Sequence, residues 1–216
     1  MRLITLMIAS GLLFSSPAIP DPIAHWNFDN DFKDVIGEYD GAPVCDATIA
    51  EEDDVKRVDG NGYLELDGDG DYVMVGFPIP ENGSYSKLAW ARLTGDVSGG
   101  SNIMTAGDAG GGHGLLSWQG TMRVIHGKAG EENRWTDTET PIPMDEWIHW
   151  AVTYNHEIRV LKIYMNGELV KQSSPKGMVG EHVNPDRIGS YEQMSFWEGQ
   201  IAVSYTHLTL PTICSV

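Results

Sequence analysis

Short segments in which apolar and polar residues alternate recur between residues 21 and 201, and clusters of Gly, Asn, Asp and Pro separate them. Successive side chains of a β-strand point to opposite faces, so this alternation is typical of strands that bury one face. The clearest such segments are IAHWNF at 23–28, GYLELD at 62–67, DYVMV at 71–75, YSKLAWARL at 85–93, GLLSW at 114–118, TMRVIHG at 121–127, EWIHWAVTYN at 146–155, RVLKIYMNGELVKQS at 159–173, DRIGS at 186–190 and FWEGQI at 196–201. No segment holds the 3.6-residue period of a long helix. The pattern predicts an all-β fold, a two-sheet antiparallel sandwich.

Turn residues mark the connections between these segments. Asn166-Gly167 lies between two alternating runs and is the signal of a type I′ hairpin turn. The charged stretch 45–60 is predicted to be a surface loop. The glycine-rich stretch DAGGGHG at 108–114, which contains His113, is predicted to be a flexible connection.

The first 18 residues differ from the rest of the chain. Arg2 precedes the apolar run LITLMIASGLLF, and a small-x-small cleavage site ends at Ala18. This arrangement is typical of a secretory signal peptide. We therefore expect residues 1–18 to be removed and the protein to be secreted, either extracellular or periplasmic. The run is too short to span a bilayer, and no other apolar run approaches ~20 residues, so we expect no membrane insertion.

The last 15 residues, AVSYTHLTLPTICSV, contain no charged residue. Ala202 to Thr212 resemble the translation of a transposase-type sequencing adapter. We therefore expect 19–201 to be the native domain and 202–216 to be a non-native tail. Cys214 would then be foreign and Cys45 unpaired, and the last strand of the sandwich would be truncated after Ile201.

The chain is strongly acidic, with a formal net charge of −17. A surface dominated by negative charge disfavours nucleic acid and anionic membranes as partners. It suits a secreted protein that attracts cations.

Several motifs follow one another in a recognisable order. They are AHWNFDND at 24–31, GYLELDGDGDYVMV at 62–75, SKLAWARL at 86–93, DEWIHWAVTYN at 145–155, KIYMNGELV at 162–170, RIGS at 187–190 and FWEGQI at 196–201. Together they resemble the laminin-G-like, concanavalin A-like lectin and glucanase jelly rolls of secreted bacterial proteins. The resemblance implies a jelly-roll sandwich and a non-catalytic module that binds carbohydrate or extracellular, cell-surface partners. A structural adhesion domain without a defined ligand is an alternative.

The resemblance also implies a structural Ca²⁺ between the end of the first strand and the last strand. The first-strand candidate is Asp29, with Asp31 as its neighbour. The last-strand partner would be an aspartate at position 202, where this sequence has alanine.

The stretch LDGDGDYV at 66–73 resembles a calcium loop at first sight. An EF-hand counted from Asp67 would need a glycine at its sixth position and a glutamate at its twelfth, which are Tyr72 and Pro78. The stretch is therefore predicted to be a hairpin turn, with Asp67 kept as a further metal candidate.

A glycoside hydrolase is the enzymatic alternative. Laminarinase-type glucanases share the sandwich and carry three carboxylates on one strand face, and Glu65, Asp67 and Asp69 come closest to that pattern. Gly68 and Gly70 weaken a strand at that place. We therefore expect no catalytic activity.

Exposed aromatic side chains could bind carbohydrate, because their rings stack on the apolar faces of sugars. Trp26, Trp90, Trp147 and Trp150 lie in alternating segments, and most are predicted to be core residues. Trp135, in EENRWTDTET, has polar neighbours on both sides and is the main candidate for ligand binding. Trp118 and Tyr191 are further candidates near turns.

Overall fold

The computed structural model describes residues 22–52, 60–76, 79, 82–106, 112–132, 134–180 and 184–207, and of residues 203, 205 and 207 it describes the backbone alone. The predicted signal peptide at 1–18 and residues 208–216 of the predicted tail lie outside the described residues. So do residues 53–59 of the predicted surface loop.

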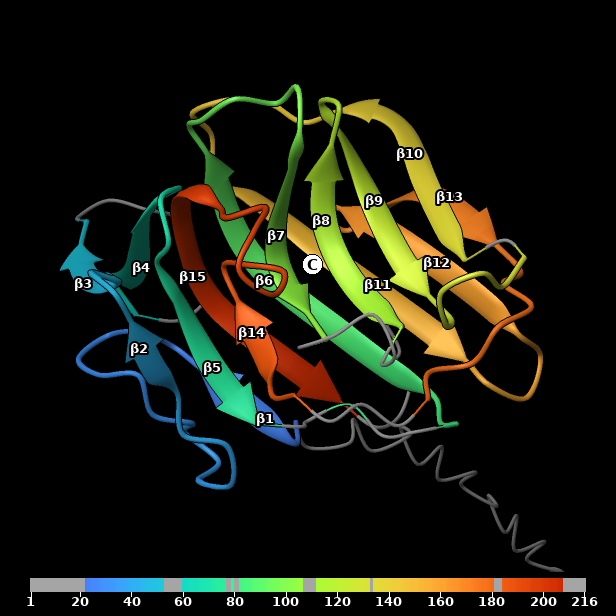
Figure 1. Ribbon diagram of the computed structural model, residues 1–216, viewed down its shortest axis with the longest axis horizontal. Helices are drawn as coiled ribbons and strands as arrows, with labels where there is room; N and C mark the ends of the chain where they lie inside the picture. The colour runs from blue at the N-terminus through green and yellow to red at the C-terminus, as the bar shows by residue number, and fades with distance from the viewer. Residues whose placement is uncertain are drawn as a thin grey trace, which may run out of the picture.

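The described chain forms two antiparallel β-sheets that pack face to face (Figure 1). The eight strands of sheet A are β1 (Ala24–Trp26), β3 (Thr48–Glu51), β4 (Gly62–Asp67), β6 (Tyr85–Leu93), β11 (Ile148–Asn155), β12 (Val160–Met165), β13 (Glu168–Ser173) and β15 (Glu198–His207). The seven strands of sheet B are β2 (Ala42–Val44), β5 (Tyr72–Gly76), β7 (Gly100–Thr105), β8 (His113–Trp118), β9 (Thr121–His126), β10 (Trp135–Pro141) and β14 (Asp186–Ile188). This architecture confirms the predicted all-β, two-sheet jelly-roll sandwich.

The strand order brings distant segments together. Sheet A runs β13-β12-β11-β6-β15-β4-β3, with β1 paired to β15, and sheet B runs β10-β9-β8-β7-β14-β5-β2. The first described strand, β1, therefore lies beside the last one, β15, which is an interior strand of sheet A.

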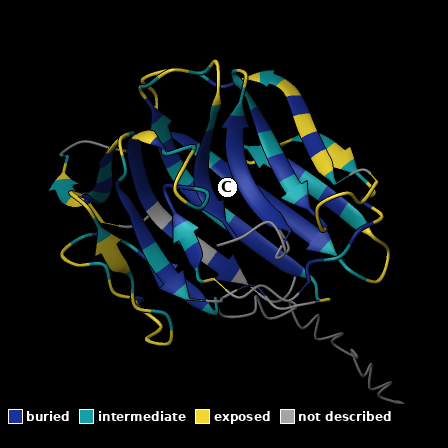
Figure 2. Cartoon of the chain, viewed as in Figure 1, coloured by how far each residue is buried: buried dark blue, intermediate teal, exposed yellow. Residues whose placement is uncertain are grey.

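The alternation of β6 shows why these residues form a sandwich. Its inward residues Tyr85, Ala89 and Leu93 are buried, whereas Trp90 and Arg92 are half-buried on the outer face of sheet A. The inward faces of both sheets meet in one apolar core, which Figure 2 shows as buried strand centres with exposed turns. Burial of apolar area between two such faces is the main force that holds a sandwich together.

The tryptophans divide differently from the prediction. Trp26, Trp150 and Trp197 are fully buried. Trp90 and Trp147 were grouped with the mainly core tryptophans, but they are half-buried and lie outside the central cluster. The period of a strand identifies two alternating faces, but it does not say which face meets the other sheet.

The predicted tail supplies part of the last strand, β15, and the truncation of the native strand after Ile201 stays a prediction. Strand β15 runs from Glu198 to His207 between β6 and β4, so no gap remains in sheet A. A register shift lies between Ala202 and Ser204, and the inward positions beyond it hold Ser204 and Thr206, both buried. The Ser204 hydroxyl has no hydrogen-bond partner in the described structure. Ser204 is therefore unfavourable at this core position, because its buried hydroxyl loses its hydration without gaining a hydrogen bond. The adapter origin of 202–216 stays a prediction.

A group of buried polar side chains joins the two sheets. The Lys87 ammonium on β6 hydrogen-bonds Nδ1 of His113 on β8. Nε2 of His113 lies 3.3 Å from Oδ2 of Asp186 on β14, and neither of these two side chains is exposed. Burial lowers the pKa of Lys87 to about 7, and the Asp186 carboxylate opposes this shift. His113 was expected in a flexible connection; instead it begins β8 and is buried within the sandwich.

A second buried pair lies beside this group. The Tyr85 hydroxyl and Nδ1 of His126 are hydrogen-bonded at 2.9 Å, and the His126 ring packs on Tyr154 with centroids 3.8 Å apart. Burial lowers the pKa of His126 to about 3, and the charge of His113 adds to this effect. A pKa this low keeps His126 neutral in the folded protein at neutral pH.

We predict that acid destabilises the fold through His126. Between about pH 6.5 and 3 the unfolded chain binds a proton that the folded chain does not, so the free energy of unfolding decreases as the pH falls. His126→Gln should weaken this dependence in denaturation curves recorded across that range. His156→Gln, on the turn after β11, is the control. An unchanged pH slope in His126→Gln would contradict the prediction.

We also predict that Ser204→Ala stabilises the protein by about 1 kcal/mol, because it removes a buried hydroxyl without a partner. Thr105→Val is the matched control, since the Thr105 hydroxyl donates a 2.6 Å hydrogen bond to the Ser190 carbonyl. Chemical denaturation should therefore give opposite signs for the two variants, and a destabilised Ser204→Ala would refute the assignment.

Candidate functional site

An arginine lies between two tryptophan rings on the outer face of sheet B. The guanidinium carbon of Arg123, on β9, is 4.5 Å from the ring centroid of Trp118 on β8 and 4.7 Å from that of Trp135 on β10. Both distances fall within the range of cation–π attraction. Three adjacent strands thus build one cluster, which we call the Trp118–Arg123–Trp135 cluster.

Asp137 fixes the orientation of this arginine. It lies directly opposite Arg123 in the β9–β10 register. Arg123 donates from Nε to Oδ1 at 2.5 Å and from Nη2 to Oδ2 at 2.8 Å. This two-bond pairing is geometrically specific, since both groups are planar forks. The arginine plane, and with it the ring of Trp135, is held in place.

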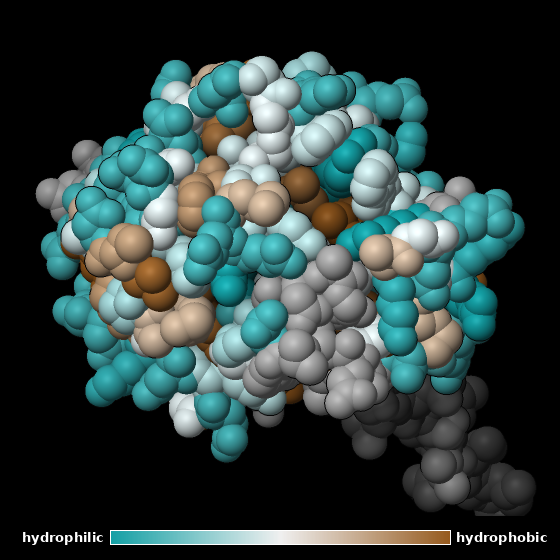
Figure 3. All heavy atoms as spheres, in the orientation of Figure 1, coloured by the Kyte–Doolittle hydropathy of each residue, from teal (hydrophilic) through white to brown (hydrophobic). Residues whose placement is uncertain are grey.

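The cluster offers an exposed ring beside a polar hollow. Trp135 is 57% exposed, whereas the Arg123 side chain is only 11% exposed. A pocket of about 340 Å³ adjoins it, lined by Trp135, Thr136, Asp137, Lys171, Ser173 and Ser174. The Thr136 and Ser173 hydroxyls are hydrogen-bonded at 2.7 Å, which links the β10 edge to the β13 edge. Figure 3, which views sheet B from outside, shows apolar and polar side chains intermixed on this face.

The structure brings together two of the three predicted ligand-binding residues. Trp118 and Trp135 share the cluster, although 17 positions separate them in the numbering. Tyr191 lies on the connection between β14 and β15, which is held to β7 by hydrogen bonds from Asn102 to Ser195. The described contacts of the cluster do not include Tyr191. Arg123 was missed by sequence reasoning, and its only signal was an outward position on an alternating strand.

The outer face of sheet A carries a second polar network that the sequence did not indicate. Arg92 lies 4.9 Å from the Trp147 ring centroid and pairs with Glu52 at 3.2 Å. Arg92 Nε also donates to Gln200 at 2.7 Å, and Gln200 donates to Glu65 at 2.6 Å. These side chains come from several strands and satisfy one another.

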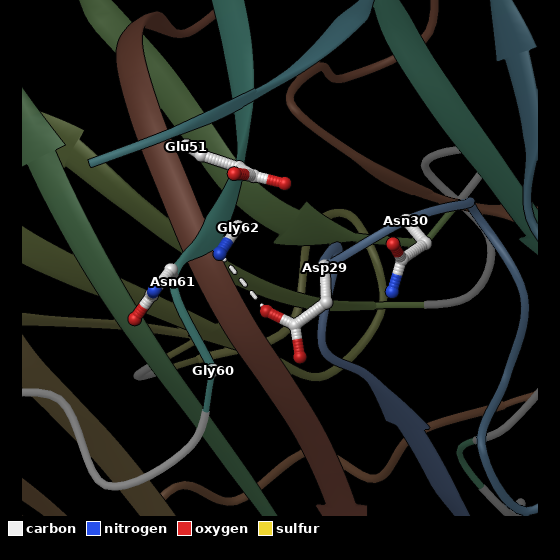
Figure 4. A pocket seen from close by; sticks show the side chains of 6 residues that line it. All are labelled: Asp29, Asn30, Glu51, Gly60, Asn61 and Gly62. Atoms are coloured by element: carbon white, nitrogen blue, oxygen red, sulfur yellow. Dashed lines mark hydrogen bonds between the residues drawn. The ribbon is translucent and has the colours of Figure 1, made fainter. Parts of the chain in front are cut away.

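The predicted metal residue Asp29 lies at a polar pocket lined also by Asn30, Glu51, Gly60, Asn61 and Gly62 (Figure 4). Its Oδ1 accepts a 2.9 Å hydrogen bond from the Gly62 amide, and its Oδ2 accepts one of 3.0 Å from the Asn27 amide group. The carboxylate therefore clamps the end of the first strand to the start of β4. Residue 202 is alanine and supplies no side-chain ligand, so the residues present do not complete the calcium site that the resemblance implied.

The other two predicted metal residues do not join Asp29. Asp31 accepts a hydrogen bond from the Lys33 amide, and the Lys33 ammonium is 3.8 Å from its carboxylate. Asp67 lies at the end of β4, where it approaches Asp46 and Asp71.

The carboxylates considered for glycoside hydrolysis also separate. Glu65 and Asp67 are alternate residues of β4, but that strand ends at Asp67 and Asp69 follows in the turn. The Asp69 amide donates a 2.8 Å hydrogen bond to the Asp67 carboxylate, as in an Asx turn.

A family model described as the concanavalin A-like lectin/glucanases superfamily matches residues 67–203. The chain belongs to this superfamily. The resemblance found in the sequence motifs is therefore confirmed. A search of curated proteins gave no match.

Solved structures share the concanavalin A-like fold. Domain 4 of AbnA, a GH43 extracellular arabinanase from Geobacillus stearothermophilus, solved in complex with arabinotriose, has a TM-score of 0.71 at 20% identity and covers 91% of this chain and 96% of its own. The botulinum neurotoxin D receptor binding domain has a TM-score of 0.61 at 16% identity, covering 89% of this chain and 50% of its own. The binding domain of botulinum neurotoxin DC in complex with SialylT has a TM-score of 0.62 at 16% identity, covering 89% and 49%. The chain thus spans about half of the toxin domains. At these identities the likeness shows the fold.

Across the described ranges, no helix has the length and apolarity required to cross a lipid bilayer.

We predict that Asp29→Ala lowers the free energy of unfolding by about 2 kcal/mol, because it removes the clamp between the first strand and β4. Asp31→Ala, at an exposed neighbouring position, should change it by less than about 0.5 kcal/mol. Equilibrium denaturation checks both values, and equal effects of the two variants would contradict the clamp.

Proposed function

We propose that the chain is a secreted, non-catalytic module that binds carbohydrate at the Trp118–Arg123–Trp135 cluster. The observation that carries the proposal is the exposed ring of Trp135, held in a fixed orientation beside a polar pocket.

The chemistry of the cluster suits a sugar. A pyranose or furanose ring has an apolar face that packs on an aromatic plane, and hydroxyl groups at its edge that need hydrogen-bond partners. Trp135 supplies the plane, and Asp137, Lys171 and Ser173 supply acceptors and donors in the adjoining pocket.

The similar structures support glycans as the ligand class. The arabinanase domain was solved with arabinotriose, and one toxin binding domain with SialylT. These ligands belong to those proteins, and the low identities do not transfer them. They make arabino-oligosaccharides and sialylated glycans the first compounds to test.

We propose binding rather than hydrolysis because the nearest carboxylate set does not stay on one strand face. Asp69 lies in the turn after β4, and the Glu65 carboxylate accepts a hydrogen bond from Gln200. Two carboxyl groups facing each other across a cleft are what glycoside hydrolysis needs.

We predict that a glycan array gives selective signals for the wild-type protein and that Trp135→Ala weakens them at least about tenfold, which corresponds to about 1.4 kcal/mol. The stacking plane is lost while the core is untouched. Leu169→Ala is the matched control, since Leu169 is a 52% exposed apolar residue on β13.

The array also separates the alternatives. Selective binding that survives in Trp135→Ala would place the site elsewhere. No selective glycan on a folded sample would favour a structural adhesion domain or an extracellular protein partner. Released reducing ends would favour a hydrolase.

A further inference from the structure

Two connections between the sheets lie side by side at the β2–β3 edge of the sandwich. Strand β2 pairs with β5 in sheet B, whereas β3 pairs with β4 in sheet A. The β2–β3 connection and the β4–β5 connection therefore both cross from one sheet to the other at the same place. Figure 1 shows both at the edge opposite β10 and β13.

The two connections approach each other closely, and one of them contains a residue with an uncommon backbone conformation. Cys45 has a φ of 56°, an uncommon value for a residue with a side chain. A side chain at Gly70 would contact the sulfur of Cys45, with the first added carbon 3.6 Å away. The two connections are thus in near contact, and their carboxylates are drawn together.

Asp46 comes from the β2–β3 connection, and Asp67 and Asp71 flank the β4–β5 turn. Each places a carboxylate oxygen within 4.8 Å of those of the other two. None of the three forms an ion pair with a lysine or arginine in the described part of the chain. Three like charges at this spacing repel one another unless a cation or a proton intervenes.

Asp71 provides the observation that points to a ligand. It is only 1% exposed, and its Oδ2 accepts a 2.9 Å hydrogen bond from the Asp67 amide. Its Oδ1 is buried and has no hydrogen-bond partner among the described residues. Burial raises the pKa of Asp71, and the negative charges of Asp67 and Asp46 contribute to the increase. A buried carboxylate oxygen without a partner is costly, and native structures leave few of them without a reason.

We propose that Asp46, Asp67 and Asp71 bind a Ca²⁺ ion that joins the two sheet-crossing connections. Calcium binds oxygen ligands at about 2.3–2.6 Å, so two ligands of one ion lie at most about 5 Å apart, which the three carboxylates satisfy. The cation would take the free Oδ1 of Asp71 and remove the repulsion among the three charges. The three side chains are all carboxylates, the hard oxygen donors that Ca²⁺ prefers, whereas zinc favours nitrogen and sulfur ligands.

This site differs from the one that the family resemblance suggested. It does not use Asp29, whose carboxylate clamps β4, and it does not need an aspartate at position 202. It also lies at the opposite edge of sheet B from β10, so it is independent of the proposed glycan site.

The test is a calcium titration of the full chain, freed of metal with a chelator, followed by isothermal calorimetry and by the thermal unfolding midpoint. We expect one site with a Kd on the order of 10⁻⁴–10⁻³ M, the range of extracellular calcium modules, and a midpoint that rises with Ca²⁺. Mg²⁺ at the same concentration should have a smaller effect. Terbium, excited through neighbouring Tyr72, gives an optical probe of the same site.

Asp46→Asn is the first variant, because Asp46 is exposed and its loss leaves the core intact. It should weaken Ca²⁺ at least about tenfold and abolish most of the rise in midpoint. Asp71→Asn should do the same, and without metal it should be at least as stable as the wild type, because a buried, repelled charge is gone. Asp29→Asn, the matched control, should keep the calcium response.

Two results would overturn the site. One is no heat and no midpoint shift for the wild type at millimolar Ca²⁺. The other is a calcium response that Asp29→Asn removes and Asp46→Asn retains, which would return the ion to the end of the first strand.

Discussion

The pairing of β6 with β15 is the interaction on which the rest of the sandwich depends. These two strands lie in the middle of sheet A, and β11, β4 and β1 add to their outer edges. The inward residues of β6 supply both apolar core contacts and Lys87, which reaches sheet B through His113. The position of sheet B against sheet A is thus fixed by burial and by a polar contact that tolerates little displacement. Replacing one partner of such a buried group is strongly destabilising, because it leaves an uncompensated charge in the interior.

The sequence alone predicted the strands in which apolar and polar residues alternate regularly. Strand β6 and the hairpin around Asn166 follow the alternation and turn signals closely, and the structure confirms them. Strand β10 could not be read in the same way: its inward residues Thr136 and Thr138 are polar, so no apolar period marks it. Strand β3, at the far edge, is short and charged at its end, and it looked like part of a loop. Edge strands are hard to predict from hydrophobic periodicity. One of their edges faces solvent and their side chains are less deeply buried, so they need fewer apolar residues.

The candidate sites were predictable residue by residue but not as groups. Trp135 was identified by its polar neighbours and Trp118 by its place near a turn. The role of Arg123 emerged only from the β8–β9–β10 register, which places it between them. The acidic stretch after β4 is a turn, but the predicted hairpin is wrong, because β4 pairs within sheet A and β5 within sheet B. Asp46, which approaches this turn, belongs to a segment about twenty residues earlier that sequence spacing cannot connect to it. Cross-strand register and sheet-crossing connections are long-range properties, and a local pattern does not contain them.

The paired hydrogen bonds between Arg123 and Asp137 affect the entropy cost of binding a ligand at Trp135. A lone exposed tryptophan samples several rotamers, and a partner that stacks on it must first select one of them. Here one face of the ring rests on a guanidinium that is itself held by two hydrogen bonds, so the side chain has already lost much of that freedom on folding. Association then orders little of the protein, and more of the contact free energy remains as affinity. The proposed site at Trp135 would therefore select ligands by their shape, with little adjustment of its own.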